Sequence, residues 1–143
     1  MVVDTRYVDV NVFVYWLGKH PVFGETAYRW VKDIERAPRG EYVTSSLTIY
    51  EVMVIIAGLS RRSLEDFSFV SSILEAFTGL GGLAVEELSI EDFSLALELM
   101  DKFKIDFEDA LHAAISMRLN IREIVSNDED FDKTPLKRIF KVG

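Results

Sequence analysis

The chain has 143 residues, enough for one domain with a substantial core, and 49% of them are hydrophobic. It has no cysteine and only two histidines, which excludes disulfides, thiolate zinc sites and a cysteine nucleophile and argues against an imidazole-based zinc site. The formal net charge of −8 is unusual for a nucleic-acid-binding protein, although residues 133–143 carry four basic side chains and no acidic one.

Strand and helix patterns alternate along the chain, without a linker, an internal repeat or a low-complexity stretch. In chain order the patterns predict a strand at Arg6–Val10, an apolar segment of ambiguous type at Asn11–Gly18, a helix at Phe23–Arg36 and a strand at Tyr42–Ser45. They then predict a helix with N-cap Ser46 that runs through Ala57 and stops at Gly58, a helix at Ser63–Phe77 and a strand at Leu83–Leu88. The last predicted elements are a helix opened by the capping-box-like Ser89–Asp92, a helix at Asp106–Leu119, a strand at Glu123–Ser126 and a strand at Arg138–Val142. This alternation predicts an α/β fold with a mostly parallel sheet covered on both faces. In such folds, sites form beyond the carboxyl ends of the strands.

Asp9 and Asn11 stand at the junction between the first strand and the apolar segment, where either residue type commonly caps a helix. Taken alone, they favour that structural role. Glu51 is more informative, because it is the only charged residue between Glu41 and Arg61 in an otherwise apolar helix. A carboxylate inside a buried helix has to be protonated, paired or metal-bound, so Glu51 favours a functional site, with a salt bridge as the alternative.

The helix at 106–119 leaves two interpretations of its acidic start open. Asp109 projects nearly opposite the centre of the apolar stripe, so periodicity predicts that it faces solvent, and Asp106 has the position of an N-cap. However, the small residues Ala113 and Ser116 neighbour Asp109 and would let another element approach that face. We expect His112 to be packed or capping rather than catalytic, since no nucleophile partner is evident.

Two further motifs fail on their details. The acidic run that starts at Asp128 is not an EF-hand, because Lys133 and Ile139 stand where its loop needs Gly and Glu. Residues 79–84 match the spacing of a dinucleotide-binding fingerprint, but they follow a helix and precede a strand, the reverse of the required order. We therefore interpret this glycine-rich run as a helix stop and a turn.

Taken in order over nearly the whole chain, the acidic motifs resemble the PIN-domain nucleases, particularly the small VapC-like toxin ribonucleases. The segments that carry the resemblance are Asp9-Val10-Asn11 after the first strand, Glu51 in the helix after Thr44-Ser45-Ser46, Asp109-Ala110-Leu111-His112-Ala113-Ala114, and Ser126-Asn127-Asp128-Glu129-Asp130-Phe131. The chain departs from the usual D-T-N start by having Val10, and from the usual T-x-D by having Ser126. Neither departure removes an acidic residue.

The resemblance implies one PIN domain over residues 1–143, with a three-layer α/β/α fold. It implies a metal-dependent single-strand endoribonuclease that leaves a 5′-phosphate and a 3′-hydroxyl, as the toxin of a toxin–antitoxin pair. The implied catalytic and metal-binding quartet, holding Mg²⁺ or Mn²⁺, is Asp9, Glu51, Asp109 and Asp128. The implied supporting residues are Asn11, Asp106, Ser126 and Asp130. The candidates for RNA contacts are Arg61, Arg62, Lys133 and Lys137. The implied partners are single-stranded RNA, a cognate antitoxin and a second copy of the chain.

Other function classes remain open. One is a non-catalytic PIN-like module that binds RNA or protein. Another is a receiver-like or phosphatase domain, but the phosphatase motif needs a second Asp and a Thr where Asn11 and Phe13 stand, and a receiver would have only Lys141 as its lysine. We expect a cytoplasmic protein, because no signal-peptide pattern is present and the apolar stretch Val52–Leu59 is too short to span a membrane.

Overall fold

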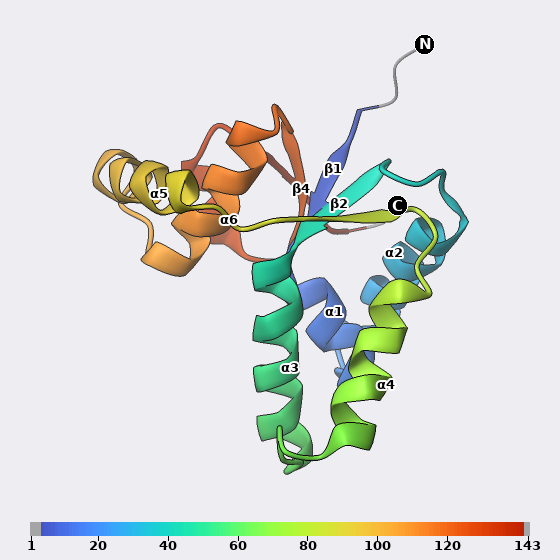
Figure 1. Ribbon diagram of the computed structural model, residues 1–143. Coiled ribbons are helices and arrows are strands. Elements are labelled where there is room, and N and C mark those ends of the chain that lie inside the picture. Colours follow the sequence, from blue (N-terminus) through green and yellow to red (C-terminus); the bar gives the residue numbers. More distant parts are fainter. Residues whose placement is uncertain (1–3, 142–143) are drawn as a thin grey trace.

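The computed structural model describes residues 4–141, which form a five-stranded sheet with helices on both faces (Figure 1). In chain order the elements are β1 (Arg6–Val8), α1 (Val10–Leu17), α2 (Gly24–Arg36), β2 (Tyr42–Ser45), α3 (Ser46–Ser60), α4 (Phe67–Thr78), β3 (Leu83–Glu86), α5 (Ile90–Phe103), α6 (Phe107–Arg118), β4 (Glu123–Val125), the short 3-10 helix η1 (Glu129–Lys133) and β5 (Lys137–Ile139). The strand order is β3-β2-β1-β4-β5, and every pairing is parallel. The predicted three-layer α/β/α fold is confirmed.

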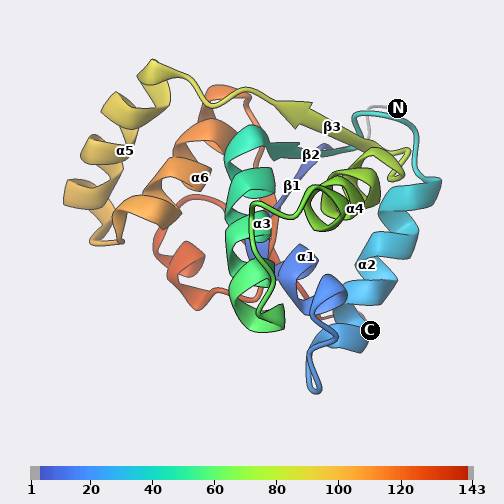
Figure 2. The same ribbon diagram turned by 60° about the horizontal axis from the view of Figure 1, so that its bottom comes forward.

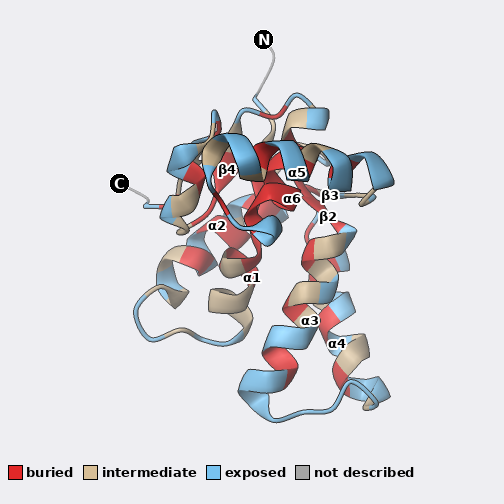
Figure 3. Ribbon diagram, turned by 90° about the vertical axis from the view of Figure 1, so that its left-hand side faces the viewer, coloured by how far each residue is buried: buried red, intermediate tan, exposed pale blue. Residues whose placement is uncertain are grey.

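Two hydrophobic cores lie on opposite faces of the sheet. Successive residues of a strand point to opposite faces, and accordingly Tyr7 packs with α5 and α6 whereas Val8 packs with α1 to α4. On the first face α6 covers the sheet and α5 packs on α6 (Figure 2). Buried segments are concentrated on the strands and α6, and the outer parts of α3, α4 and α5 are exposed (Figure 3).

The helix α2 illustrates how the sequence specifies this packing. Ala27, Trp30, Val31 and Ile34 recur at helical spacing and are all buried against the sheet, as the periodicity predicted. The indole Nε1 of Trp30 also donates a hydrogen bond to the backbone oxygen of Phe140 at 2.7 Å. This bond ties α2 to the segment that follows β5.

Helices α3 and α4 extend from the sheet as a hairpin (Figures 1 and 3). Large apolar side chains are exposed on it, with Tyr50 63%, Leu59 67% and Phe67 85% accessible. Among residues 4–141, however, no helix combines the length and the apolar character needed to cross a membrane.

The boundaries of α3 and α4 differ from those predicted. The N-cap of α3 is Ser45 rather than Ser46, with its Oγ accepting from Thr48 N at 3.4 Å. The helix continues past Gly58 to Ser60, and its C-cap Arg61 adopts a left-handed conformation with φ 56°. The next helix begins only after Asp66, which caps α4. The predicted terminal strand begins one residue earlier and is shorter, and its Val142 lies outside the described residues.

The glycine-rich turn between α4 and β3 has a packing role. A Cβ at Gly82 would lie 2.4 Å from the backbone oxygen of Ile34 and 2.7 Å from the Cβ of Ala37. Only glycine lets this turn approach the end of α2 so closely. The run is a turn, as its position in the sequence predicted.

Candidate metal centre

Three of the predicted aspartates meet beyond the carboxyl ends of the central strands. Asp9 follows β1, Asp128 follows shortly after the neighbouring strand β4, and Asp109 lies in the first turn of α6. Together with Asn11 and Glu108, they line a hollow of about 200 Å³. Parallel pairing of β1 with β4 therefore brings together residues that are more than a hundred positions apart in the chain.

The Asp9 side chain does not have the capping role that the isolated motif favoured. Asp9 occupies the N-cap position of α1 with extended backbone angles, yet its carboxylate makes no side-chain capping hydrogen bond. Instead, its Oδ2 accepts a 2.6 Å hydrogen bond from the buried hydroxyl of Ser126. Burial is the main factor raising the pKa of Asp9, opposed by His112 and by the Ser126 hydroxyl.

Ser126 links the two strand ends. Besides donating to Asp9, its Oγ accepts from the backbone N–H of Asp128 at 3.0 Å and from Asn11 Nδ2 at 3.3 Å. The amide oxygen of Asn11 in turn accepts from Asn127 N at 3.3 Å. These contacts hold the two strand ends in a fixed relation, and they place Asn11 and Ser126 beside the acidic hollow.

Asp109 is buried, contrary to the prediction from periodicity. Its side chain lies in the hollow and the residue is only 7% exposed. Burial, and then the negative charges of Asp128, Asp106 and Asp9, raise the pKa of Asp109 to about 8. Asp106 is the N-cap of α6 and accepts from Asp109 N at 2.8 Å, as its position predicted. Periodicity failed here because residues distant in sequence cover the polar side of α6.

Glu51 belongs to an adjacent cluster. Its Oε1 lies 2.7 Å from Nε2 of His112, and Glu51, Glu108 and His112 each offer an atom within 4.8 Å of the others. Burial raises the pKa of Glu51, but hydrogen bonds from His112 and Glu108 outweigh it and the net pKa is lowered. Partial desolvation and the neighbouring Glu51 raise the pKa of Glu108 to about 7. The two carboxyl groups thus compete for one proton.

Glu108 was not among the predicted site residues. Its only signal in the sequence was an acidic side chain beside Asp109 in the first turn of a helix, which the helix dipole also explains. The structure shows that it faces the same hollow as Asp109.

His112 is fully buried, and both of its ring nitrogens have partners. Nδ1 lies 2.7 Å from the hydroxyl of Tyr7, and Nε2 contacts Glu51. Burial lowers the pKa of His112, but Tyr7 and the carboxylates of Glu51 and Asp9 outweigh it, so the net pKa is raised. The expectation of a packed histidine is correct, although packing is not its only interaction.

The predicted basic residues are spread more widely than the acidic ones. Lys133 lies near the hollow, with Nζ 3.2 Å from Oδ1 of Asp130. Arg61 and Arg62 follow α3, ten residues or more beyond Glu51, which corresponds to about 15 Å along a helix. Lys137 begins β5, at the opposite end of the parallel sheet from the acidic hollow. Only Lys133 is brought close to the acidic residues.

The donor atoms suit a hard divalent cation. Oxygen atoms of Asp109, Asp128 and Asp130 lie within 4.8 Å of one another, and Asp9 contributes negative charge beside them. Magnesium and manganese favour carboxylate oxygen ligands, and a cation would relieve the mutual repulsion that raises the pKa of Asp109. The residues present therefore fit such an ion, with converging oxygen atoms from Asp109, Asp128 and Asp130 and with Asp9 in the same hollow.

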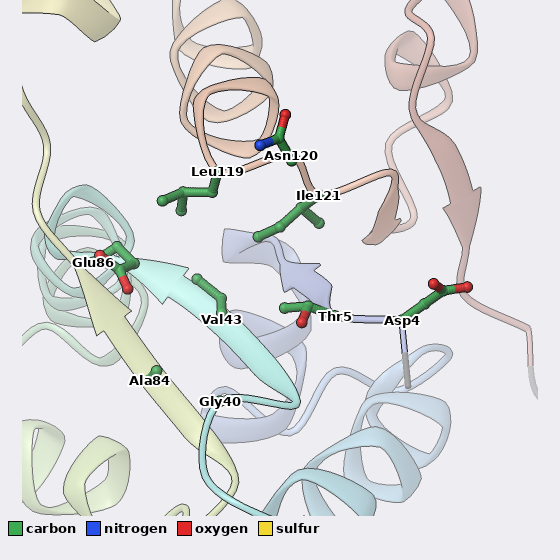
Figure 4. A pocket seen from close by; sticks show the side chains of 9 residues that line it. All are labelled: Asp4, Thr5, Gly40, Val43, Ala84, Glu86, Leu119, Asn120 and Ile121. Atoms are coloured by element: carbon green, nitrogen blue, oxygen red, sulfur yellow. The ribbon is translucent and has the colours of Figure 1, made fainter. Parts of the chain in front are cut away.

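A second hollow, of about 400 Å³, lies mainly toward the opposite end of the sheet (Figure 4). It is lined by residues that precede β1, β2 and β4, by Val43 of β2 and by Ala84 and Glu86 of β3. Asp4 and Glu86 are its acidic residues, and Figure 4 shows them on separate sides of it. None of the predicted site residues lines this hollow.

Comparison with known proteins supports the fold. The model of the PIN domain family matches residues 6–137. VapC20 of Mycobacterium tuberculosis, a toxin that cleaves the sarcin–ricin loop, is similar in structure with a TM-score of 0.73 and 16% identity, covering 96% of this chain and 100% of that chain. VapBC2 of Rickettsia felis, bound to a promoter DNA fragment, is similar with a TM-score of 0.67 and 19% identity, covering 94% of this chain and 97% of that chain. FitAcB of Neisseria gonorrhoeae is similar with a TM-score of 0.62 and 16% identity, covering 94% of this chain and 96% of that chain. No curated protein has significant sequence similarity to the chain.

Proposed function

Because this chain belongs to the PIN domain family, we propose that it is a metal-dependent endoribonuclease acting on single-stranded RNA, the toxin of a toxin–antitoxin pair, and that the whole chain is one PIN domain. The observation that carries the proposal is the convergence of Asp9, Asp109 and Asp128 in one hollow. Buried carboxylates that raise one another's pKa are unfavourable without a counter-charge. A divalent cation would supply that charge and would support phosphodiester hydrolysis at the same place.

Each site residue has a separate role in the proposed reaction. Asp9, Asp109 and Asp128 hold Mg²⁺ or Mn²⁺, and Glu51 contributes from the adjacent cluster. When bound, the ion polarises the phosphate, neutralises developing negative charge and activates water. The carboxylate of Asp109 or that of Asp128 orients the attacking water. The Ser126 hydroxyl, at 2.6 Å from Asp9, fixes the direction of that carboxylate. No side chain forms a covalent bond to the substrate.

Substrate approach is consistent with the charges near the hollow. The centre is acidic and would repel phosphate in the absence of a cation, so metal binding and RNA binding are linked. Lys133 supplies a positive charge next to Asp130 at the rim. We assign it to a phosphate contact, whereas Arg61 and Arg62 would meet only a longer RNA strand.

Protein partners fit the exposed apolar surface of the α3–α4 hairpin. Tyr50, Leu59 and Phe67 are the kind of residues that protein interfaces bury. Among the structures of similar fold are a toxin–antitoxin complex from Klebsiella pneumoniae and VapBC2 of Rickettsia felis. An antitoxin and a second copy of this chain are therefore the partners we assign.

The test is cleavage of an end-labelled single-stranded RNA with Mg²⁺, Mn²⁺ or EDTA, using wild type, Asp9→Asn and the control Asp101→Asn. Asp101 is an exposed aspartate on α5, so its variant makes the same chemical change away from the site. We expect metal-dependent cleavage by wild type and by Asp101→Asn, with a loss of at least 100-fold, as an order-of-magnitude expectation for a metal ligand, in Asp9→Asn.

Cleavage that persists in Asp9→Asn, or that is insensitive to EDTA, would contradict the proposed centre. Folded wild type, freed of bound partner, that cleaves under no metal condition would favour a non-catalytic binding module instead. Far-UV circular dichroism of each variant separates loss of activity from loss of fold.

A further inference from the structure

A line of buried side chains joins the sheet to Glu51. The Tyr7 hydroxyl lies 2.8 Å from Ser45 Oγ and 2.7 Å from His112 Nδ1, and His112 Nε2 lies 2.7 Å from Glu51 Oε1. Tyr7 is in β1, Ser45 ends β2, His112 is in α6 and Glu51 is in α3. Four separate elements thus meet in one chain of hydrogen bonds. Contacts between neighbouring turns of a single helix could not produce this arrangement.

The direction of the last bond is fixed by chemistry. An ionised carboxylate only accepts hydrogen bonds, so Nε2 of His112 carries the hydrogen and donates it to Glu51. A neutral ring then accepts at Nδ1 from the Tyr7 hydroxyl, whereas a charged ring donates to it. In both cases Tyr7 fixes the orientation of the ring and the ring fixes Glu51, so the arrangement does not depend on the ring's charge.

Glu51 needs such support because of its neighbour. Glu108 lies beside it, and two carboxyl groups at this distance repel when both are ionised. A glutamate side chain has three rotatable bonds, so without the donor from His112 the Glu51 carboxylate could turn toward or away from Glu108 according to the protonation of Glu108. The bond to His112 at 2.7 Å fixes Oε1 and with it the plane of the Glu51 carboxylate.

We infer that His112 is a positioning residue, which holds the Glu51 carboxylate in place for the divalent cation while Tyr7 holds the ring. The inference rests on the proposed function. His112 and Tyr7 do not touch the substrate, and the effect of either passes through Glu51. Partners of this kind, which orient a ligand, typically change metal affinity or activity by about 10- to 100-fold when removed.

The experiment compares two amides at position 112. In His112→Gln the amide nitrogen takes nearly the place of Nε2 and can still donate to Glu51. In His112→Asn the amide reaches only the place of Nδ1 and leaves Glu51 without a donor. Both variants lose the buried ring, so their loss of thermal stability serves as a matched measure of the packing defect. Tyr7→Phe removes only a hydroxyl, and Ser116→Ala is the control because its hydroxyl bonds the backbone oxygen of His112 within α6.

Two measurements are made on each variant: Mn²⁺ binding by titration calorimetry, and kcat and KM for RNA cleavage. We expect His112→Asn to weaken Mn²⁺ binding by at least tenfold and to lower kcat with little change in KM, in line with known ligand-orienting partners. His112→Gln should stay within about threefold of wild type, Tyr7→Phe should lie between the two amides, and Ser116→Ala should match wild type.

Equal Mn²⁺ affinity in the Asn and Gln variants would overturn the inference, since a purely structural role affects both alike. A wild type that binds Mn²⁺ and cleaves RNA, together with an unaffected His112→Asn, would also overturn it while leaving the proposed function intact. A wild type that neither binds Mn²⁺ nor cleaves RNA would instead reject the proposed function and, with it, this role. The amides are separable even if both lose stability, because binding is measured below the lower melting temperature.

Discussion

Replacing Asp109 with Asn should stabilise the metal-free protein, because the carboxyl group of Asp109 is held where its ionised form is unfavourable. Its pKa is about 8 in the folded protein, against an ordinary 3.8. Between these values the folded chain binds a proton that the unfolded chain has released. Stability contributed by this group is therefore fully present below about pH 4 and is lost as the pH rises toward 8.

The magnitude follows from that interval. Each pH unit between the two pKa values corresponds to about 1.4 kcal/mol, so the limiting penalty near pH 7.5 is about 5 kcal/mol. Three effects reduce this limiting penalty. Asp109 shares its proton with Asp128 and Asp9, the hollow relaxes around the charge, and burying the amide of the Asn variant has a cost of its own. We expect Asp109→Asn to raise the free energy of unfolding by about 2 kcal/mol at pH 7.5 and by about zero at pH 4. For a domain of this size, 2 kcal/mol corresponds to a melting temperature higher by roughly 6 °C.

The assay is urea unfolding followed by circular dichroism, in EDTA, at pH 4, 6 and 7.5. Asp101→Asn is the control for an exposed aspartate. Repeating the series with Mn²⁺ should reverse the order, since Mn²⁺ at 100 times its Kd stabilises wild type by about 2.7 kcal/mol, whereas Asp109→Asn loses most of this gain. An Asn variant that is destabilised equally at every pH, or that responds to Mn²⁺ as wild type does, would refute the reasoning.

Three further predictions concern other parts of the molecule. Asp92→Asn should cost about 2 kcal/mol at pH 7, because the buried carboxylate binds Arg118 at 2.7 Å. Burial raises the pKa of Asp92, but Arg118 outweighs it and the net pKa is lowered. Urea unfolding should therefore show the cost decreasing as the pH falls below the ordinary range of an aspartate and the wild-type group becomes protonated. Gly82→Ala should lower stability by about 2 kcal/mol in the same assay, since the new Cβ would overlap a backbone oxygen of α2, and an unchanged urea midpoint would show that the turn can move. Ser126→Ala should weaken Mn²⁺ binding by about tenfold in calorimetry, because Asp9 loses its hydroxyl donor; unaltered binding would mean that Asp9 is oriented by other contacts.

The sequence predicted the elements of the fold well because their signals are local. The buried positions of α2 follow from spacing alone, and the starts of α5 and α6 follow from capping residues such as Ser89 and Asp106. Choosing Ser46 instead of Ser45 as a cap was wrong by one residue, because both are serines at the end of a strand. Gly58 did not end its helix, since a single glycine lowers helix stability only modestly.

The site was harder to predict because its decisive contacts are long-range. The burial of Asp109 depends on residues that precede α1 and follow β4, which no helical periodicity can reveal. The roles of Glu108 and His112 likewise depend on Glu51, which comes from a helix more than fifty residues earlier. Order and spacing of acidic motifs indicated the quartet through a family resemblance, whereas physical reasoning on each motif alone left Asp109 undecided and favoured a cap at Asp9.

The pairing of β1 with β4 also bears on when the centre can come into existence during synthesis. Asp9 leaves the ribosome well before Asp128, so the carboxylate set stays incomplete until Asp128 has emerged. A shorter nascent chain has β1 at an open sheet edge and lacks Asp128. A chain whose translation stops between β1 and β4 likewise lacks Asp128. The order of strands therefore restricts the centre to molecules that have been translated beyond β4.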